Sequence, residues 1–137
     1  MRLVIRRRID KLVSAKNTLM KITIIGAGNM GGALARGWAG TRMHRVTVTA
    51  RSEETLARYA GITGICTSLD NVSAVRDADI IVLAVKPWLV ESVCRQIAGA
   101  VDFDRQMILS VAANVFTDTL RNYLGNEQAK VLYVMPN

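Results

Sequence analysis

The sequence predicts a doubly wound α/β fold, in which helices cover both faces of a parallel sheet. Short β-branched or aliphatic runs alternate with helix-forming segments along almost the whole chain. A glycine-rich segment, GAGNMG at residues 26–31, directly follows the first such run and opens a helix. The run IIVLAV at residues 80–85 is apolar at every position, as expected of a central strand that is buried on both faces.

Six strands are predicted where apolar and β-branched residues cluster between turn residues. They span residues 22–25, 46–49, 64–67, 80–85, 107–110 and 131–134. Because crossover connections between parallel strands are right-handed, the expected strand order is 3-2-1-4-5-6. We therefore expect three layers (helix, sheet, helix) and no internal repeats.

The helices are predicted from their own start and stop signals. They span residues 29–39, 52–59, 70–76, 87–98 and 117–125. Ser52 and Asp70 can accept hydrogen bonds from the free amides at a helix start. Pro87 suits a first helical position, and Gly125 suits a left-handed helix end.

The composition fits one globular domain with an aliphatic core, because half of the 137 residues are hydrophobic and 21% are charged. The net charge of +7 could suggest nucleic-acid binding. However, six of the 18 basic residues lie within residues 1–20, and the rest of the chain holds 12 basic and 10 acidic residues. We therefore expect no nucleic-acid partner. We also expect no membrane partner, because no apolar run is long enough to cross a bilayer.

The chain is expected to comprise a basic N-terminal extension, residues 1–19, and a domain over residues 20–137. Apolar residues at helical spacing would allow a short amphipathic helix in the extension, which we expect to be mobile. A presequence or a membrane-surface helix is the alternative. Cys66 and Cys94 lack metal-ligand spacing and His44 is the only histidine, so we predict no metal site and two reduced thiols in a cytoplasmic protein.

The GAGNMG segment has the G-x-G-x-x-G spacing of dinucleotide-binding turns. Gly26 lets the chain turn off the strand, Gly28 lets a pyrophosphate approach the backbone, and Gly31 lets the helix lie close to the sheet. Free amides at the helix start favour a phosphate. A tight turn without a ligand would show the same glycines, but the βαβ context favours a dinucleotide. The candidate residues are Gly26, Ala27, Gly28, Asn29, Met30 and Gly31.

The end of the second strand bears on the choice of nucleotide. Domains that prefer NAD usually carry Asp or Glu there, whereas this chain has Ala50, Arg51 and Ser52. Arg51 could pair with a 2′-phosphate and Ser52 could hydrogen-bond to it. The sequence therefore predicts NADP(H) as the cofactor, although Arg51 could also be an ordinary solvated charge.

Ligands of such sheets bind beyond the carboxyl ends of the strands, near the switch between strands 1 and 4. Two segments are therefore expected beside the nicotinamide, and ordinary strand-end packing is the alternative for both. Their residues are Ala84, Val85, Lys86, Pro87, Val111, Ala112 and Ala113. No acid–base pair is evident: His44 is expected on a loop away from this edge, and Lys86 is at most a positioning group. We therefore predict no catalytic residue.

Taken together, these motifs resemble the N-terminal domain of the pyrroline-5-carboxylate reductase family over about residues 20–137. The matching segments are GAGNMG at 26–31, Asp70-Asn71, LAVKP at 83–87, LSVAANV at 109–115 and VMPN at 134–137. Asn114 departs from the pattern, because the family commonly has glycine there. The resemblance implies a Rossmann-type domain and NADPH-dependent reduction of the C=N bond of 1-pyrroline-5-carboxylate to L-proline, a step of amino-acid biosynthesis.

The resemblance also implies individual roles. The glycine segment would hold the pyrophosphate, Arg51 would lie by the 2′-phosphate and Asn71 near the adenosine half, while residues 84–87 and 111–113 would line the nicotinamide half. Asn71 could equally be a helix-start residue that bonds only local backbone.

In the family, a helical domain after the MPN motif completes the substrate pocket and forms the dimer. We therefore expect residues 20–137 to be a cofactor-binding half, short of its last strands and with little activity alone. Any homo-oligomer would need another surface. The alternatives are a stand-alone NADP-binding module without catalysis, and the first half of another NADP-dependent dehydrogenase of the β-hydroxyacid type.

Overall fold

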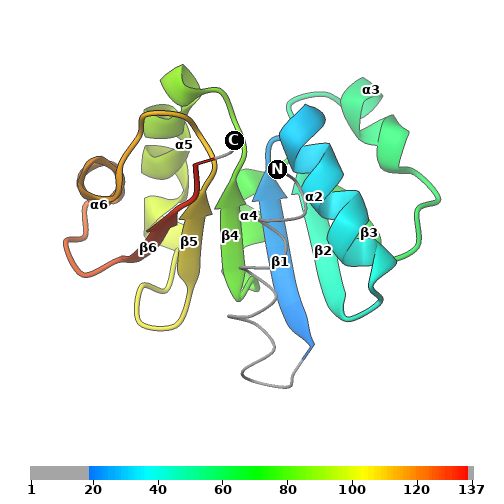
Figure 1. The fold of residues 1–137 in the computed structure, drawn as a ribbon, viewed down its shortest axis with the longest axis horizontal. Helices are drawn as coiled ribbons and strands as arrows, with labels where there is room; N and C mark the ends of the chain where they lie inside the picture. Colours follow the sequence, from blue (N-terminus) through cyan, green and yellow to red (C-terminus); the bar gives the residue numbers. More distant parts are fainter. Residues whose placement is uncertain (1–18, 136–137) are drawn as a thin grey trace.

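The computed structural model describes residues 19–135, which form a three-layer α/β domain (Figure 1). Its six strands are β1 (Met20–Ile25), β2 (His44–Thr49), β3 (Ile65–Ser68), β4 (Ile80–Leu83), β5 (Met107–Ser110) and β6 (Lys130–Tyr133). Every pairing between neighbours is parallel, and the order is β3-β2-β1-β4-β5-β6. The predicted fold class and strand order are therefore confirmed.

The helices follow the predicted signals closely. They are α2 (Asn29–Gly40), α3 (Glu53–Leu56), α4 (Asn71–Arg76), α5 (Val90–Ile97) and α6 (Thr117–Leu124), with 3₁₀ turns η1 (Ala57–Tyr59), η2 (Pro87–Leu89) and η3 (Ala98–Ala100). Ser52 Oγ accepts from the Thr55 amide at 3.3 Å, and Gly125 ends α6 at φ 69°. Asp70 Oδ1 accepts from Val72 and Ser73, and the bond from the Ser73 amide is the largest of the causes that lower the pKa of Asp70.

Several predicted boundaries are wrong: the ends of most strands differ by one or two residues, and the expected helix over residues 52–59 is divided into α3 and η1. Strand β4 ends at Leu83 rather than at residue 85, because its neighbours end in register with it: Leu83 pairs with Ile25 on one side and Ser110 on the other. The expected helix over residues 87–98 is divided into η2, α5 and η3. His44 does not lie on a loop, because β2 begins there; the residue is buried opposite Met20, at the amino end of the sheet.

The two faces of the sheet are packed by different helices. On one face, α2 buries Leu34, Ala35 and Trp38 against β1, β2 and β4. On the other face, α4 packs against β1 and β2, and α5 and α6 cover β4 and β5 (Figure 1). Cys94 lies in this second core, and burial raises the pKa of its thiol to about 12, so it stays protonated at neutral pH; Cys66 is also free but exposed.

The predicted extension lies outside the described residues except for residue 19, as do residues 136–137 of the VMPN segment. Among the described helices, none has both the length and the apolar character needed to cross a bilayer.

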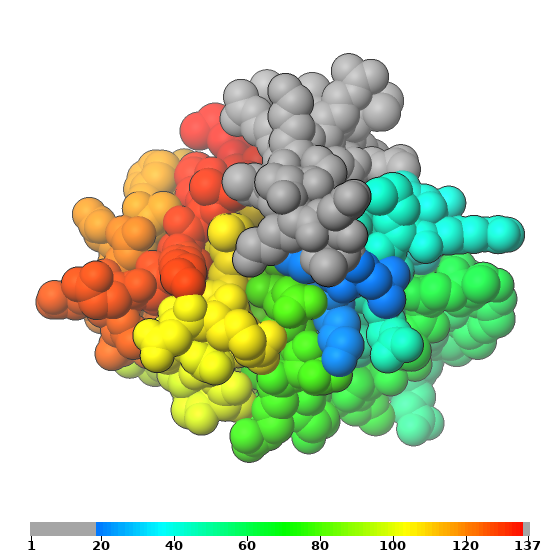
Figure 2. All heavy atoms as spheres, turned by 90° about the horizontal axis from the view of Figure 1, so that it is seen from below, coloured from blue at the N-terminus to red at the C-terminus, as the bar shows by residue number. Residues whose placement is uncertain are grey.

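The amino ends of β1, β4 and β5 lie at the end of the molecule opposite the carboxyl edge of the sheet, and Figure 2 shows these segments side by side (blue, green and yellow). Gln106, just before β5, is fully buried there. Its Nε2 donates to the carbonyls of Val75 and Ala78, both at 2.6 Å, and its Oε1 accepts from the Asp102 amide at 2.8 Å. One side chain therefore joins α4 to the segment that starts β5.

Replacing Gln106 by leucine is expected to lower the free energy of unfolding by about 2 kcal/mol, because buried backbone groups lose their partner. Urea denaturation would measure the change. Gln128→Leu is the matched control, since Gln128 is exposed and should change the free energy by less than about 0.5 kcal/mol. Equal effects of the two substitutions would contradict the role of Gln106.

Candidate functional site

A cavity of about 1100 Å³ opens at the carboxyl edge of the sheet. Because all strands run in parallel, the segments that follow β1, β2, β4 and β5 meet at this edge. All the residues predicted as cofactor-binding, except Gly31, line this one cavity. The structure therefore brings together segments that lie far apart in the sequence, such as those that follow the neighbouring strands β1 and β4.

The glycine turn packs directly on the end of β4. Gly26 has φ +110°, and a Cβ atom there would lie 2.4 Å from the Ala84 carbonyl oxygen. A Cβ atom on Gly31 would lie 1.9 Å from the Gly26 carbonyl oxygen. Gly31 is thus buried within the turn and does not line the cavity, unlike the other predicted residues of the motif. Its role is to let α2 begin directly over Gly26.

Gly28 differs from both neighbours in the motif. It lines the cavity, and a Cβ atom there would meet nothing within 4 Å. It precedes α2 as the capping residue without a side-chain hydrogen bond, in an extended conformation that other residues can adopt. The fold therefore does not require a glycine at this position.

Arg51 and Ser52 lie exposed at the rim of the cavity, beyond the end of β2. Among the described residues, no carboxylate forms an ion pair with Arg51. The Ser52 hydroxyl caps α3 and lies 2.9 Å from the Thr55 hydroxyl, which also lines the cavity. A guanidinium and two hydroxyls are thus available at this end of the site.

Asn71 joins three elements at the cavity wall. The Thr49 hydroxyl donates to Asn71 Oδ1 at 2.5 Å, and Asn71 Nδ2 donates to Gln96 Oε1 at 3.0 Å. Asp70, not Asn71, caps α4. The alternative that Asn71 bonds only local backbone is therefore wrong: its amide is held toward the cavity by side chains of β2 and α5.

Sequence reasoning missed part of the lining. Those residues come from β1, β2, α3, η1, η2 and α5 and from the loop before α4: Ile25, Thr49, Thr55, Arg58, Leu69, Leu89, Ser92, Val93 and Gln96. The spacing of Ser92, Val93 and Gln96 marks one face of a helix, but the sequence does not reveal which face meets the sheet.

At the other end of the cavity, the turn after β5 contains Asn114, which departs from the glycine expected there. Asn114 adopts φ 62°, a left-handed conformation that asparagine tolerates better than most residues, and its amide donates to the Tyr133 hydroxyl at 3.2 Å. The Tyr133 ring in turn packs edge-on against Phe116, with centroids 5.3 Å apart. Ala112 and Ala113 precede this turn and leave room above the end of β5.

The charged side chains that line the cavity are Arg51, Arg58 and Lys86, and its described lining holds no carboxylate, imidazole or thiol. Among the described residues, no group of three or more His, Cys, Asp or Glu side chains could hold a metal ion. The site is therefore suited to bind an anionic ligand along an apolar floor, and it presents Lys86 as the one ionisable group near the β4 end.

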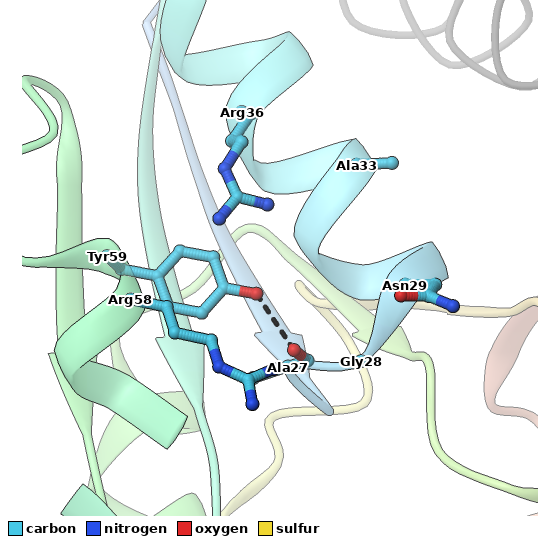
Figure 3. A pocket seen from close by; sticks show the side chains of 7 residues that line it. All are labelled: Ala27, Gly28, Asn29, Ala33, Arg36, Arg58 and Tyr59. Atoms are coloured by element: carbon cyan, nitrogen blue, oxygen red, sulfur yellow. Dashed lines mark hydrogen bonds between the residues drawn. The ribbon is translucent and has the colours of Figure 1, made fainter. Parts of the chain in front are cut away.

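A second cavity of about 410 Å³ adjoins the first at the glycine turn, and Figure 3 shows the residues that line it. The two share Ala27, Gly28, Asn29 and Arg58. Ala33, Arg36 and Tyr59 complete the smaller cavity. The Tyr59 hydroxyl donates to the Ala27 carbonyl at 2.9 Å, which ties η1 to the glycine turn.

Comparison with known proteins gives a consistent result. A family model described as "NADP oxidoreductase coenzyme F420-dependent" matches residues 21–114. The chain is 36% identical over 119 residues to the pyrroline-5-carboxylate reductase of Vibrio alginolyticus, which covers 85% of this chain and 43% of the relative. The chain thus spans less than half the length of the curated relatives it matches.

Solved structures agree with this result. The pyrroline-5-carboxylate reductase of Coxiella burnetii superposes with a TM-score of 0.81 at 30% identity, over 88% of this chain and 45% of that one. The pyrroline carboxylate reductase of Plasmodium falciparum, solved with NADP bound, has a TM-score of 0.71 at 26% identity, over 86% and 42%.

The distinct environments of the glycines predict distinct effects on stability. Gly31→Ala should lower the free energy of unfolding by about 3 kcal/mol, because its methyl group would collide with the Gly26 carbonyl. Gly28→Ala should change it by less than about 0.5 kcal/mol, because that methyl group would face open space. Chemical denaturation of both variants tests the assignment, and an equally large loss for Gly28→Ala would show that the fold itself needs a glycine there.

Proposed function

The chain belongs to the family described as NADP oxidoreductase, coenzyme F420-dependent, and from this we propose that it is the cofactor-binding part of a pyrroline-5-carboxylate reductase. One observation carries the proposal: segments from four strand ends, each predicted to contact part of NADP(H), line a single cavity of about 1100 Å³. The named relatives act as pyrroline-5-carboxylate reductases, and one was solved with NADP bound.

In this proposal each part of the cofactor meets a matching part of the cavity. The backbone of the glycine turn at residues 26–30 holds the pyrophosphate, since Gly28 leaves this backbone accessible from the cavity and the start of a helix offers free amides to a phosphate. Arg51 and Ser52 bind the 2′-phosphate. Asn71 lies beside the adenosine half, and residues 84–87 and 111–113 bound the nicotinamide half.

The bound cofactor would supply the hydride that reduces the C=N bond of 1-pyrroline-5-carboxylate to L-proline. The residues of this chain would contribute position rather than acid–base chemistry, because holding the reacting carbons together removes much of the barrier. The short residues Ala84, Ala112 and Ala113 allow a flat ring to lie on the ends of β4 and β5. The reduced nitrogen also needs a proton, and Lys86 is the one ionisable side chain of the described lining beyond the end of β4.

Substrate binding would then depend on a further part of the protein, consistent with the share of the relatives' length that the chain covers. A cytoplasmic location remains part of the proposal and rests on the interpretation of Cys66 and Cys94 as reduced thiols. The alternatives are a nucleotide-binding module without catalysis and the first half of a β-hydroxyacid-type dehydrogenase.

Titration with NADPH and NADH tests the nucleotide assignment. The unaltered chain should bind NADPH at least about tenfold more tightly, as expected for charge-assisted hydrogen bonds to a phosphate. Arg51→Gln should remove most of this preference and leave the affinity for NADH within about twofold. Arg76→Gln, which removes an exposed arginine that does not line the cavity, is the control. Tighter binding of NADH by the unaltered chain would contradict the assignment.

A second test concerns turnover. The purified 137-residue chain should bind NADPH but show no measurable oxidation of it in the presence of 1-pyrroline-5-carboxylate. An assay that follows the decrease in NADPH absorbance over time would detect turnover far below the roughly 10 s⁻¹ typical of enzymes. Reduction at such a typical rate would show that these residues already form a complete active site.

A further inference from the structure

Arg58 is the one charged residue that lines both the large and the small cavity. It lies in η1, seven residues after Arg51, and is exposed. Glu54 precedes it by four residues, the spacing at which helical ion pairs form. Within the described part of the chain, however, Arg58 has no carboxylate partner. Its charge is therefore available to a ligand.

Arg58 continues a series of polar residues that line the large cavity. The chain changes from α3 to the 3₁₀ turn η1 at Ala57. Ser52, Thr55 and Arg58 follow one another at intervals of three residues across this change, and all three line the large cavity. Two hydroxyls and a guanidinium therefore line the same cavity as Arg51.

The residue next to Arg58 fixes the position of its backbone. Tyr59 is 2% exposed, and its hydroxyl donates to the Ala27 carbonyl of the glycine turn. Gly32 leaves the space for this hydroxyl, because a Cβ atom there would lie 2.6 Å from it. The Arg58 backbone is therefore attached to the turn that lines the large cavity.

Arg36 differs from Arg58 although it is close by. Figure 3 shows Arg36 and Arg58 on opposite sides of the Tyr59 ring. The Arg36 guanidinium lies 4.9 Å from the ring centroid in a cation–π contact, and Arg36 lines the small cavity without lining the large one. Arg36 in α2 and Arg58 in η1 thus have different surroundings although both lie beside Tyr59, which provides a charge-matched comparison.

We propose that Arg58 is a second cationic ligand of the nucleotide's 2′-phosphate and, with Arg51, determines the preference for NADP(H) over NAD(H). The inference rests on the proposed function and adds to it a residue that no motif marks. A phosphate monoester carries close to two negative charges at neutral pH and three acceptor oxygens. Two guanidiniums match that charge, and the Ser52 and Thr55 hydroxyls match further acceptors.

The test compares two ligands that differ only in this phosphate, 2′,5′-ADP and 5′-AMP, by titration at constant ionic strength. Arg58→Gln should weaken binding of 2′,5′-ADP about tenfold and leave 5′-AMP within about twofold. Arg36→Gln should leave both affinities within about twofold. Arg58→Lys should recover part of the loss, since it restores the charge but not the planar fork. Thermal unfolding of each variant verifies that the domain is folded.

The outcomes separate two failures. If the unaltered chain does not prefer 2′,5′-ADP to 5′-AMP, the assignment of NADP(H) fails and the role of Arg58 fails with it. If the preference exists and survives Arg58→Gln, only the role of Arg58 is overturned. Equal losses for Arg58→Gln and Arg36→Gln would also overturn it, because a general electrostatic field would then account for the effect.

Discussion

The close contact between the first turn and the end of β4 is the constraint on which this domain depends. The Ala84 amide donates to the Ile25 carbonyl at 2.8 Å, and the Gly26 Cα lies so close to the Ala84 carbonyl that no side chain fits. Strand β1 is followed by a connection to β2 on one side, while β4 pairs with its other side. The connection from β1 leads toward β2, whereas the connection from β4 leads toward β5 on the opposite side. The cavity opens between these two diverging connections.

The glycines around this contact serve three different purposes. Gly26 and Gly31 are needed by the backbone of the turn itself, and Gly32 is needed by a side chain, the buried Tyr59. Gly28 has no such neighbour, so its side of the turn stays accessible from the cavity. A motif that looks uniform in the sequence thus combines requirements of folding with an opening for a ligand. The hydrogen bond from the Tyr59 hydroxyl to the Ala27 carbonyl also attaches η1, which contains Arg58, to the glycine turn.

The sequence predicts the elements well where a local signal decides them. Strand β5 and helix α6 begin and end as expected, because the residues from Met107 to Ser110 form a clean apolar run and Gly125 adopts the left-handed helix end. The end of β4 is different: it depends on where its neighbours stop, which periodicity does not reveal. The motifs at the strand ends likewise locate most of the cavity, because each of them is a local signal. The sequence does not identify Gln96 and Arg58 as lining residues. Their orientation depends on how α5 and η1 pack.

The distribution of charge at the cavity separates binding from chemistry. Arg51 and Arg58 lie on the segments after β2, at the end proposed for the adenosine, whereas Lys86 is the one charged lining residue after β4. Guanidiniums far from the reacting carbon can strengthen binding of a polyphosphate ligand without opposing the positive charge of a protonated imine. A carboxylate near the imine would stabilise that charge, but the described lining contains none. In the proposed reaction, the residues described here would therefore set the cofactor's affinity and position, while protonation would depend on groups that face the nicotinamide from outside this lining.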